Sequence, residues 1–282
     1  MGFPMAGHLS KLENIDLYVH NRTGSVTKRW LKKYKHCFTS PLNNLHKLEY
    51  KLDGVITCLK DDAAISTTLV DSGLIKNIKK GGFIIDHSTS SVELVNSILK
   101  NKFLKLNNLS FFDAPVSGGE VGAINGKLSV MLGGPKTRFS HARSLMNAYS
   151  KQITHIGPNG HGQLTKMVNQ LCIAGLLQGL SEGIIFGNKS NLSMNKVLDA
   201  ISGGAAQSWQ MDNRFKAMVK GNFDFGFAVD LMIKDLQIAL KHSELMNLNL
   251  ANSKSILKKY NQLSRLGDGH LDTSSLIKLL EK

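Results

Sequence analysis

Hydrophobic and polar positions in the first half of the chain follow two alternating patterns. Short runs rich in β-branched residues are typical of strands, and the stretches between them repeat apolar residues at helical spacing. The strand-like runs cover 14–21, 53–59, 81–89, 109–119 and 126–134, and the helix-like stretches cover 23–34, 61–70 and 91–106. Alternation at this spacing predicts βαβ units in a mostly parallel, doubly wound α/β sheet.

The pattern changes after residues 156–158. Residues 162–187 form one long helical pattern with few β-branched residues, and 192–282 hold helix-like segments separated by Gly and Asn turns. The sequence therefore predicts an α/β domain over 1–158 and an all-helical domain over 159–282, joined through the long helix.

Composition narrows the class of protein. Hydrophobic residues make up 42% and charged residues 20% of the 282-residue chain, which is typical of a globular protein and not of a disordered one. No uninterrupted apolar run approaches the ~18 residues that span a bilayer, and the first residues do not resemble a secretory signal. Cys37, Cys58 and Cys172 are scattered, which indicates neither a metal site nor a disulfide framework. We expect a cytoplasmic protein without membrane contact.

A net charge of +14 raises the expectation of a nucleic-acid partner or a small anionic ligand, and a solvated, lysine-rich surface is the alternative. The basic residues are spread along the chain, and the densest group, 28–35, is typical of an exposed helix face. No zinc-finger, RRM or basic-zipper pattern is present in the sequence. We therefore expect a small anionic substrate and no nucleic acid.

Three local features suggest chemistry. The opening MGFPMAGHL fits the second half of a phosphate-binding turn, where Gly2 lets a helix approach a strand closely, although any helix start remains an alternative. Ser117-Gly118-Gly119 offers two unhindered N–H groups beside a hydroxyl, which suits a carboxylate, or it is an ordinary turn. Lys166 and Asn169 share a helix face among apolar neighbours. Burial at a domain junction would lower the pKa of Lys166, which suits a general acid or base. The alternative is a structural lysine whose side chain extends to solvent.

Six motifs in order resemble the β-hydroxyacid dehydrogenase family over essentially the whole chain. They are MGFPMAGHL, NRT (21–23), DHST (86–89), DAPVSGGEVGAINGKLSVMLGG (113–134), GHGQLTKMVNQ (160–170) and KDL (234–236). The resemblance implies an N-terminal Rossmann-type domain, a C-terminal helical domain and a homodimer or homotetramer. In the family the first strand ends in Gly-x-Gly-x-Met-Gly, whereas this chain begins at that Met. We therefore expect the first strand to be missing here, through a start assigned too late or a real truncation.

The resemblance also assigns site residues. Lys166 becomes the proton donor or acceptor and Asn169 a substrate-binding residue, joined by Ser117, Gly118 and Gly119. Phe227 forms part of an apolar wall, and Asp235 helps to fix the catalytic lysine and contributes to substrate binding. The residues assigned to the cofactor are Gly2, Phe3, Pro4, Asn21, Arg22, Thr23, Leu59, Thr89 and Lys234.

The loop after the first predicted strand, 14–21, stands where NAD-binding domains have the end of their second strand, and it indicates which cofactor is used. An acidic residue there would accept hydrogen bonds from the ribose of NAD, whereas Arg22, flanked by Asn21 and Thr23, suits a 2′-phosphate. NADP is therefore favoured, with NAD possible. The predicted function is interconversion of a short 3-hydroxy acid and its semialdehyde. The alternative is a cofactor-binding scaffold or a catalytically impaired, truncated homologue. Imine reduction on the same scaffold is disfavoured by the lysine at 166.

Overall fold

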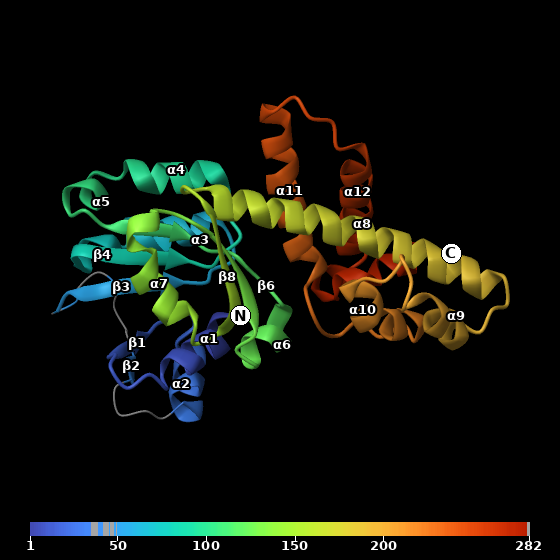
Figure 1. Ribbon diagram of the computed structural model, residues 1–282, viewed down its shortest axis with the longest axis horizontal. Helices are drawn as coiled ribbons and strands as arrows, with labels where there is room; N and C mark the ends of the chain where they lie inside the picture. Colours follow the sequence, from blue (N-terminus) through green and yellow to red (C-terminus); the bar gives the residue numbers. More distant parts are fainter. Residues whose placement is uncertain (35–38, 42–44, 46–47, 49, 281–282) are drawn as a thin grey trace. The chain divides into compact units, whose positions relative to one another are not determined.

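The computed structural model describes residues 1–34, 39–41, 45, 48 and 50–280 (Figure 1). The chain forms two compact units, Met1–Lys166 and Met167–Lys282, which are described separately below. The first contains the strands, and the second is helical.

The larger sheet of the first unit has the strand order β3-β4-β5-β7-β6, with β8 paired to β7. Its strands are β3 (Leu52–Thr57), β4 (Ile78–Asp86), β5 (Ser110–Asp113), β6 (Val116–Ser117), β7 (Leu128–Gly133) and β8 (Ser150–Gly157). The pairs β3–β4, β4–β5 and β7–β8 are parallel, whereas β7 runs antiparallel to β5 and β6. Short connections favour antiparallel neighbours, which explains the reversal at β6 and β7. The expected mostly parallel sheet is present.

A separate parallel pair consists of β1 (Leu17–Val19) and β2 (Thr39–Pro41). Within the described part of the chain, no strand pairing joins this pair to the larger sheet. In the described residues, β3 is therefore an edge strand of the larger sheet, and β1 and β2 form a two-stranded sheet of their own.

The helices of the first unit agree with the prediction in part. They are α1 (Gly2–Leu9), α2 (Gly24–Lys33), α3 (Asp62–Ser66), α4 (Val92–Lys100), α5 (Lys102–Leu106), α6 (Gly119–Ile124) and α7 (Phe139–Met146). They agree with it over 23–34 and begin as predicted near 61, whereas α6 and α7 were not predicted. The single helix expected over 91–106 is two helices, because Asn101 adopts φ −59° and ψ 124°. Its Oδ1 accepts the N–H groups of Phe103 and Leu104 and so caps α5.

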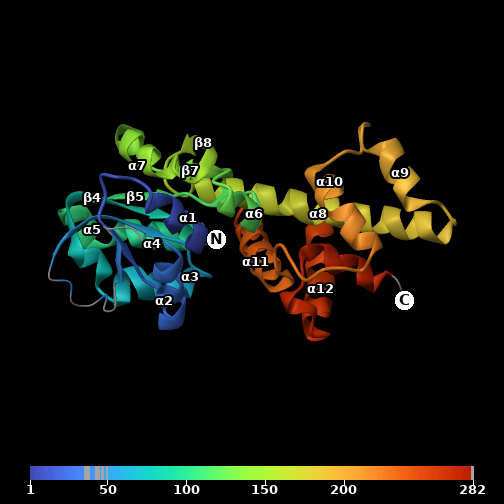
Figure 2. The same ribbon diagram turned by 90° about the horizontal axis from the view of Figure 1, so that it is seen from below.

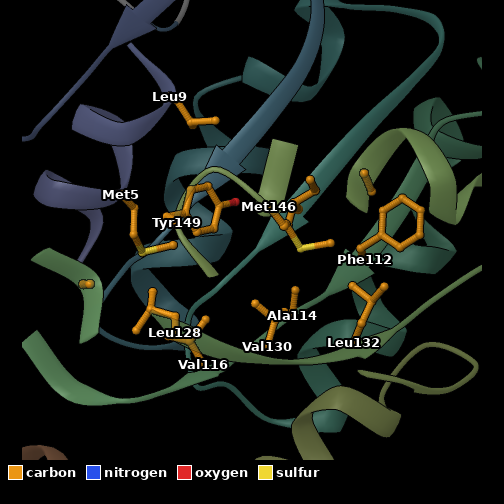
Figure 3. Close-up of a cluster of buried hydrophobic side chains, with 13 residues drawn as sticks. Met5, Leu9, Phe112, Ala114, Val116, Leu128, Val130, Leu132, Met146 and Tyr149 are labelled. Carbon is orange, nitrogen blue, oxygen red and sulfur yellow. The ribbon is translucent and has the colours of Figure 1, made fainter. Parts of the chain in front are cut away.

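Two hydrophobic clusters cover the faces of the larger sheet. Phe111 and Phe112 are consecutive on β5 and therefore point to opposite faces. Phe112 packs in the cluster that joins α1 to β7 and α7, in which Met5 and Tyr149 are buried (Figure 3). Phe111 packs in the other cluster, among residues of α3, α4 and α5. The first cluster therefore anchors the N-terminal helix of the chain to the sheet.

The second unit is built on α8 (His161–Lys189), which begins in the first unit. Its other helices are α9 (Met194–Ile201), α10 (Trp209–Val219), α11 (Val229–Leu245) and α12 (Ala251–Arg265). Figures 1 and 2 show α11 and α12 as an antiparallel pair. By length and composition alone, α8 could cross a membrane. However, Ala174, Leu177 and Ile184 along it are fully buried in the two cores of the unit, as in the central helix of a folded domain.

Candidate functional site

The N-terminus of α1 lies against the end of β3. A Cβ added to Gly2 would lie 3.2 Å from the Cβ of Cys58, so only glycine allows this approach without displacement. Pro4 is buried in the first turn of α1, where its missing N–H costs nothing. Leu59 follows Cys58 directly, so it lies one residue beyond the position at the strand end that Gly2 approaches. A helix N-terminus that meets a strand end without a Cβ in the way is a general anion-binding arrangement.

The loop with Asn21, Arg22 and Thr23 follows the carboxyl end of β1 and leads into α2. All three residues are exposed, and Asn21 Oδ1 accepts the N–H of Thr23 at 2.9 Å. Helix α2 is held to α1, because Trp30 Nε1 donates to the carbonyl of Phe3 at 2.9 Å and the Arg29 guanidinium lies 5.4 Å from the Phe3 ring. The basic helix therefore lies beside the N-terminal turn.

A buried carboxylate that the sequence reasoning missed organises the ends of β3 and β4. Asp86 Oδ1 accepts from Thr57 Oγ1 at 2.8 Å, from Ser88 Oγ at 2.6 Å and from Ser88 N–H at 3.1 Å. Ser88 Oγ in turn accepts the N–H of Leu59 at 2.8 Å. Burial raises the pKa of Asp86 to about 6. This network fixes the loop that carries Leu59. The signal in the sequence was a polar pair, Thr57 and Asp86, within buried strand runs.

His87 is neutral in this fold. Its Nδ1 lies 2.6 Å from the carbonyl of Ala114, which can only accept, so Nδ1 carries the proton. Nε2 therefore accepts from the Tyr149 hydroxyl at 2.9 Å. Burial lowers the pKa of His87 to about 4. With both nitrogens engaged and a depressed pKa, His87 is a structural residue.

The start of α8 is fixed by Asp113 and Gln163. Asp113 accepts from the N–H groups of Gly160 at 2.8 Å and Gln163 at 3.0 Å, and burial raises its pKa. The fully buried Gln163 side chain accepts from Ser90 N–H at 3.0 Å and donates to Ser88 O at 2.8 Å. Thr89 lies between these two residues, so its loop is held to the first turn of α8.

Lys166 lies beside the glycine-rich loop. It is 7% exposed, and its Nζ donates to the carbonyl of Val116 at 3.0 Å. Ser117 follows on β6, and Gly118 and Gly119 have φ of 122° and 64°, which glycine adopts readily. A Cβ added to Gly119 would meet nothing within 4 Å, so the space above it is open. The structure therefore brings together Lys166 and the three loop residues that the sequence assigned to the substrate.

In the second unit, contacts link Asn169 to Lys234 and Asp235 through Gln170. Asn169 Nδ2 lies 2.7 Å from Gln170 Oε1, Gln170 Nε2 lies 2.6 Å from Asp235 Oδ2, and Lys234 Nζ lies 2.9 Å from Asp235 Oδ1. Gln170 was not predicted; its only signal was its place on the face shared by Lys166 and Asn169.

Phe227 lies two residues before α11. Its N–H donates to Asp272 Oδ2 at 2.8 Å, and its half-buried ring packs against the core of the second unit.

These features define a class of protein. The larger sheet is mostly parallel, a helix N-terminus closes against a strand end, a buried lysine adjoins an open glycine loop, and a helical unit follows. Together they are the parts of a dinucleotide-binding oxidoreductase with a helical second domain. At Gly2 the N-terminus of α1 lies against a strand end with no Cβ on the glycine between them, an arrangement that can receive the phosphates of a dinucleotide.

Comparison with known proteins identifies the family. Residues 1–157 match the NAD-binding domain of 6-phosphogluconate dehydrogenase, and residues 160–280 match the NAD-binding domain of NADP-dependent 3-hydroxyisobutyrate dehydrogenase. An uncharacterized oxidoreductase of Shewanella frigidimarina is 41% identical over 100% of this chain and 95% of its own. The 2-hydroxy-3-oxopropionate reductase of Escherichia coli is 35% identical over 75% of this chain and 72% of its own. The chain belongs to the β-hydroxyacid dehydrogenase family.

The fold agrees with this placement. The 3-hydroxyisobutyrate dehydrogenase of Mycobacterium tuberculosis, solved with L-serine, superposes with a TM-score of 0.86 at 22% identity, covering 100% of this chain and 96% of that one. The expected Rossmann-type domain and C-terminal helical domain are therefore confirmed. Family membership also supports a nicotinamide cofactor and NAD(P)-dependent hydroxyacid dehydrogenase activity.

Proposed function

We propose that the protein is an NADP-dependent enzyme that interconverts a short 3-hydroxy acid and its semialdehyde, with Lys166 as general acid and base. The observation that carries this proposal is the buried Lys166 ammonium, 3.0 Å from Val116 O and directly beside Ser117, Gly118 and Gly119. One group can handle the reacting proton there while the loop holds a carboxylate.

The cofactor would be held mainly by residues at the strand ends. Gly2, Phe3 and Pro4 would receive the pyrophosphate at the start of α1, and Leu59 and Thr89 would line its path. Arg22, with Asn21 and Thr23, would bind the 2′-phosphate, because a guanidinium offers a fork of donors and no acid in this triplet opposes it. NADP is therefore preferred to NAD. Lys234 would lie toward the nicotinamide.

The proton chemistry belongs to Lys166. When bound, the nicotinamide supplies the hydride in reduction and accepts it in oxidation. In reduction, Lys166 Nζ donates a proton to the aldehyde oxygen; in oxidation, the neutral amine takes the proton of the C3 hydroxyl. The hydroxyl of Ser117 and the backbone N–H groups of Gly118 and Gly119 hold the substrate carboxylate. Asn169 binds the substrate, Phe227 supplies apolar surface, and Asp235 helps to fix the polar residues around Lys166.

We assign residues 1–158 to cofactor binding and 159–282 to substrate binding and dimerisation. A cytoplasmic homodimer or homotetramer is proposed, and the exposed apolar side chains of Leu176 and Phe186 on α8 support self-association.

The test is cofactor absorbance with a panel of substrates. Purified protein is incubated with NADPH or NADH and tartronate or succinic semialdehyde, and with the oxidised cofactors and glycerate or 3-hydroxyisobutyrate. We expect turnover of at least one pair, faster with NADP(H). Tight cofactor binding without turnover of any pair would contradict it and favour a cofactor-binding scaffold.

A further inference from the structure

Four polar side chains of the second unit form an ordered series of contacts, which we call the amide relay. Asn169 contacts Gln170 at 2.7 Å, Gln170 contacts Asp235 at 2.6 Å, and Lys234 pairs with Asp235 at 2.9 Å. Gln170 and Asp235 are each 2% exposed, whereas Asn169 is half-buried. The relay thus runs from an ion pair with a buried carboxylate to a side chain with access to its surroundings.

The chemistry of the ion pair fixes the direction of every hydrogen bond in the relay. An ionised carboxylate accepts hydrogen bonds and cannot donate, so Gln170 must present Nε2 to Asp235. Gln170 Oε1 then faces Asn169, and Asn169 must present Nδ2 to it. The end of the Asn169 amide opposite Gln170 is therefore its carbonyl oxygen. The relay sets an orientation that the Asn169 side chain by itself would leave open.

We infer that the relay makes Asn169 a hydrogen-bond acceptor toward the substrate, and that the site therefore selects 3-hydroxy acids with a second hydroxyl at C2. This rests on the proposed function, in which Asn169 contacts the substrate and Lys166 takes the reacting proton. A carbonyl oxygen cannot bind the substrate carboxylate, which only accepts. In oxidation, the C3 hydroxyl gives its one proton to Lys166. A C2 hydroxyl is then the group with a proton left for Asn169.

Glycerate carries such a hydroxyl, whereas 3-hydroxyisobutyrate carries a methyl group in its place. Binding of the methyl compound leaves the Asn169 carbonyl oxygen without a donor, which costs free energy. The methyl compound is therefore disfavoured even though it fits by size. We expect kcat/KM for D-glycerate to exceed that for 3-hydroxyisobutyrate by at least about tenfold, the worth of one such hydrogen bond. Gln170 and Asp235 act here through Asn169, as positioning residues.

Asp235→Asn reverses the relay without changing its shape. The Lys234 ammonium only donates, so it attracts Oδ1 of the new amide and turns Nδ2 toward Gln170. Gln170 then flips, and Asn169 presents Nδ2 to the substrate. The ratio of kcat/KM for D-glycerate to that for 3-hydroxyisobutyrate should fall by about tenfold or more. Gln170→Met removes the hydrogen bond that orients the Asn169 amide, so both orientations become accessible. It should therefore lower the ratio less than Asp235→Asn does.

A matched control is Gln178→Met, the same substitution two turns further along α8, where the side chain contacts Glu182. It should leave the ratio unchanged. Thermal unfolding of each variant shows whether it is folded. A wild-type preference for 3-hydroxyisobutyrate, or the same ratio in folded Asp235→Asn protein, would overturn the inference while the dehydrogenase function stands.

Neutron diffraction from deuterated crystals tests the relay without turnover. The expected map shows the Asn169 deuterons on the atom facing Gln170 in the wild type and on the opposite atom in Asp235→Asn. Deuterons on the opposite atom in the wild type would refute the relay. If no hydroxy acid is oxidised and no semialdehyde reduced, the proposed function and the selectivity fail together, and the neutron map still decides the relay.

Discussion

Arg22 is the residue on which cofactor choice depends in this account. Its side chain is exposed in the loop before α2, where a guanidinium can meet a 2′-phosphate. Arg22→Ala should lower kcat/KM for NADP by about 10- to 100-fold, the worth of a hydrogen bond to a charged group, and change that for NAD little. Steady-state kinetics with both cofactors measures this.

Lys28→Ala provides the control for Arg22→Ala. It removes the same charge from an exposed position of α2. An equal loss of NADP activity in the two variants would show that general positive charge matters, rather than a contact from Arg22.

Single residues also show which parts of the candidate site can be named from the sequence. Arg22, Lys166 and the Ser117 loop could be named as candidates from the sequence, because each has a chemical character that its position in a motif makes specific, and their roles stay predictions. Gln170 and Asp86 were not. Gln170 acquires its role from Asp235, which is 65 positions away in the chain, and Asp86 from Thr57 and Ser88. A pattern of local spacing carries no information on such partners.

Helix α8 is the element whose first turn holds the candidate site in place. Asp113 accepts the N–H of Gly160, which directly precedes α8, and the N–H of Gln163 in its first turn. Asp113→Ala leaves both buried groups unpaired and should lower the free energy of unfolding by about 1–3 kcal/mol. Urea denaturation followed by circular dichroism measures the change.

Asp113→Asn keeps an acceptor in the same place and should cost less than Asp113→Ala. Equal losses in the two variants would mean that the capping hydrogen bonds contribute nothing measurable to the stability of the start of α8.

Most elements were predictable from periodicity, and the exceptions have local causes. The expected helix over 91–106 divides at Asn101, because the Asn side chain caps a new helix better than it continues the old one. The antiparallel course of β7 depends on the short connection through α6. Helix α7 and strand β8 were not predicted, and β8 exposes alternate residues, a pattern that 150–157 shows only weakly in its sequence.

At the scale of the whole molecule, two buried groups give the first unit opposite dependences on pH. Burial raises the pKa of Asp86 from 3.8 to about 6, so the folded state keeps a proton that the unfolded state releases, and stability falls as pH rises through this window. Burial lowers the pKa of His87 from 6.5 to about 4, so here the unfolded state holds the extra proton and stability rises with pH. The two effects largely cancel.

In Asp86→Asn protein, the rise of stability with pH that His87 causes should no longer be offset by Asp86. Its unfolding free energy should rise between pH 4 and 6.5 by roughly 3 kcal/mol more than that of the wild type, because the opposing contribution of Asp86 is removed. Urea titrations in a Trp209→Phe background let buried Trp30 report on the first unit. Parallel pH curves for wild type and Asp86→Asn would contradict the assigned pKa of Asp86.

The central claim is that Lys166 moves the proton in a nicotinamide-dependent reaction of a hydroxy acid. The most direct measurement compares wild type and Lys166→Met in NADPH-dependent reduction of tartronate semialdehyde, with NADPH affinity measured by fluorescence titration. We expect kcat to fall by ~10²–10⁴, the usual range for a general acid, while NADPH affinity is nearly unchanged. An undiminished kcat in the variant would contradict it.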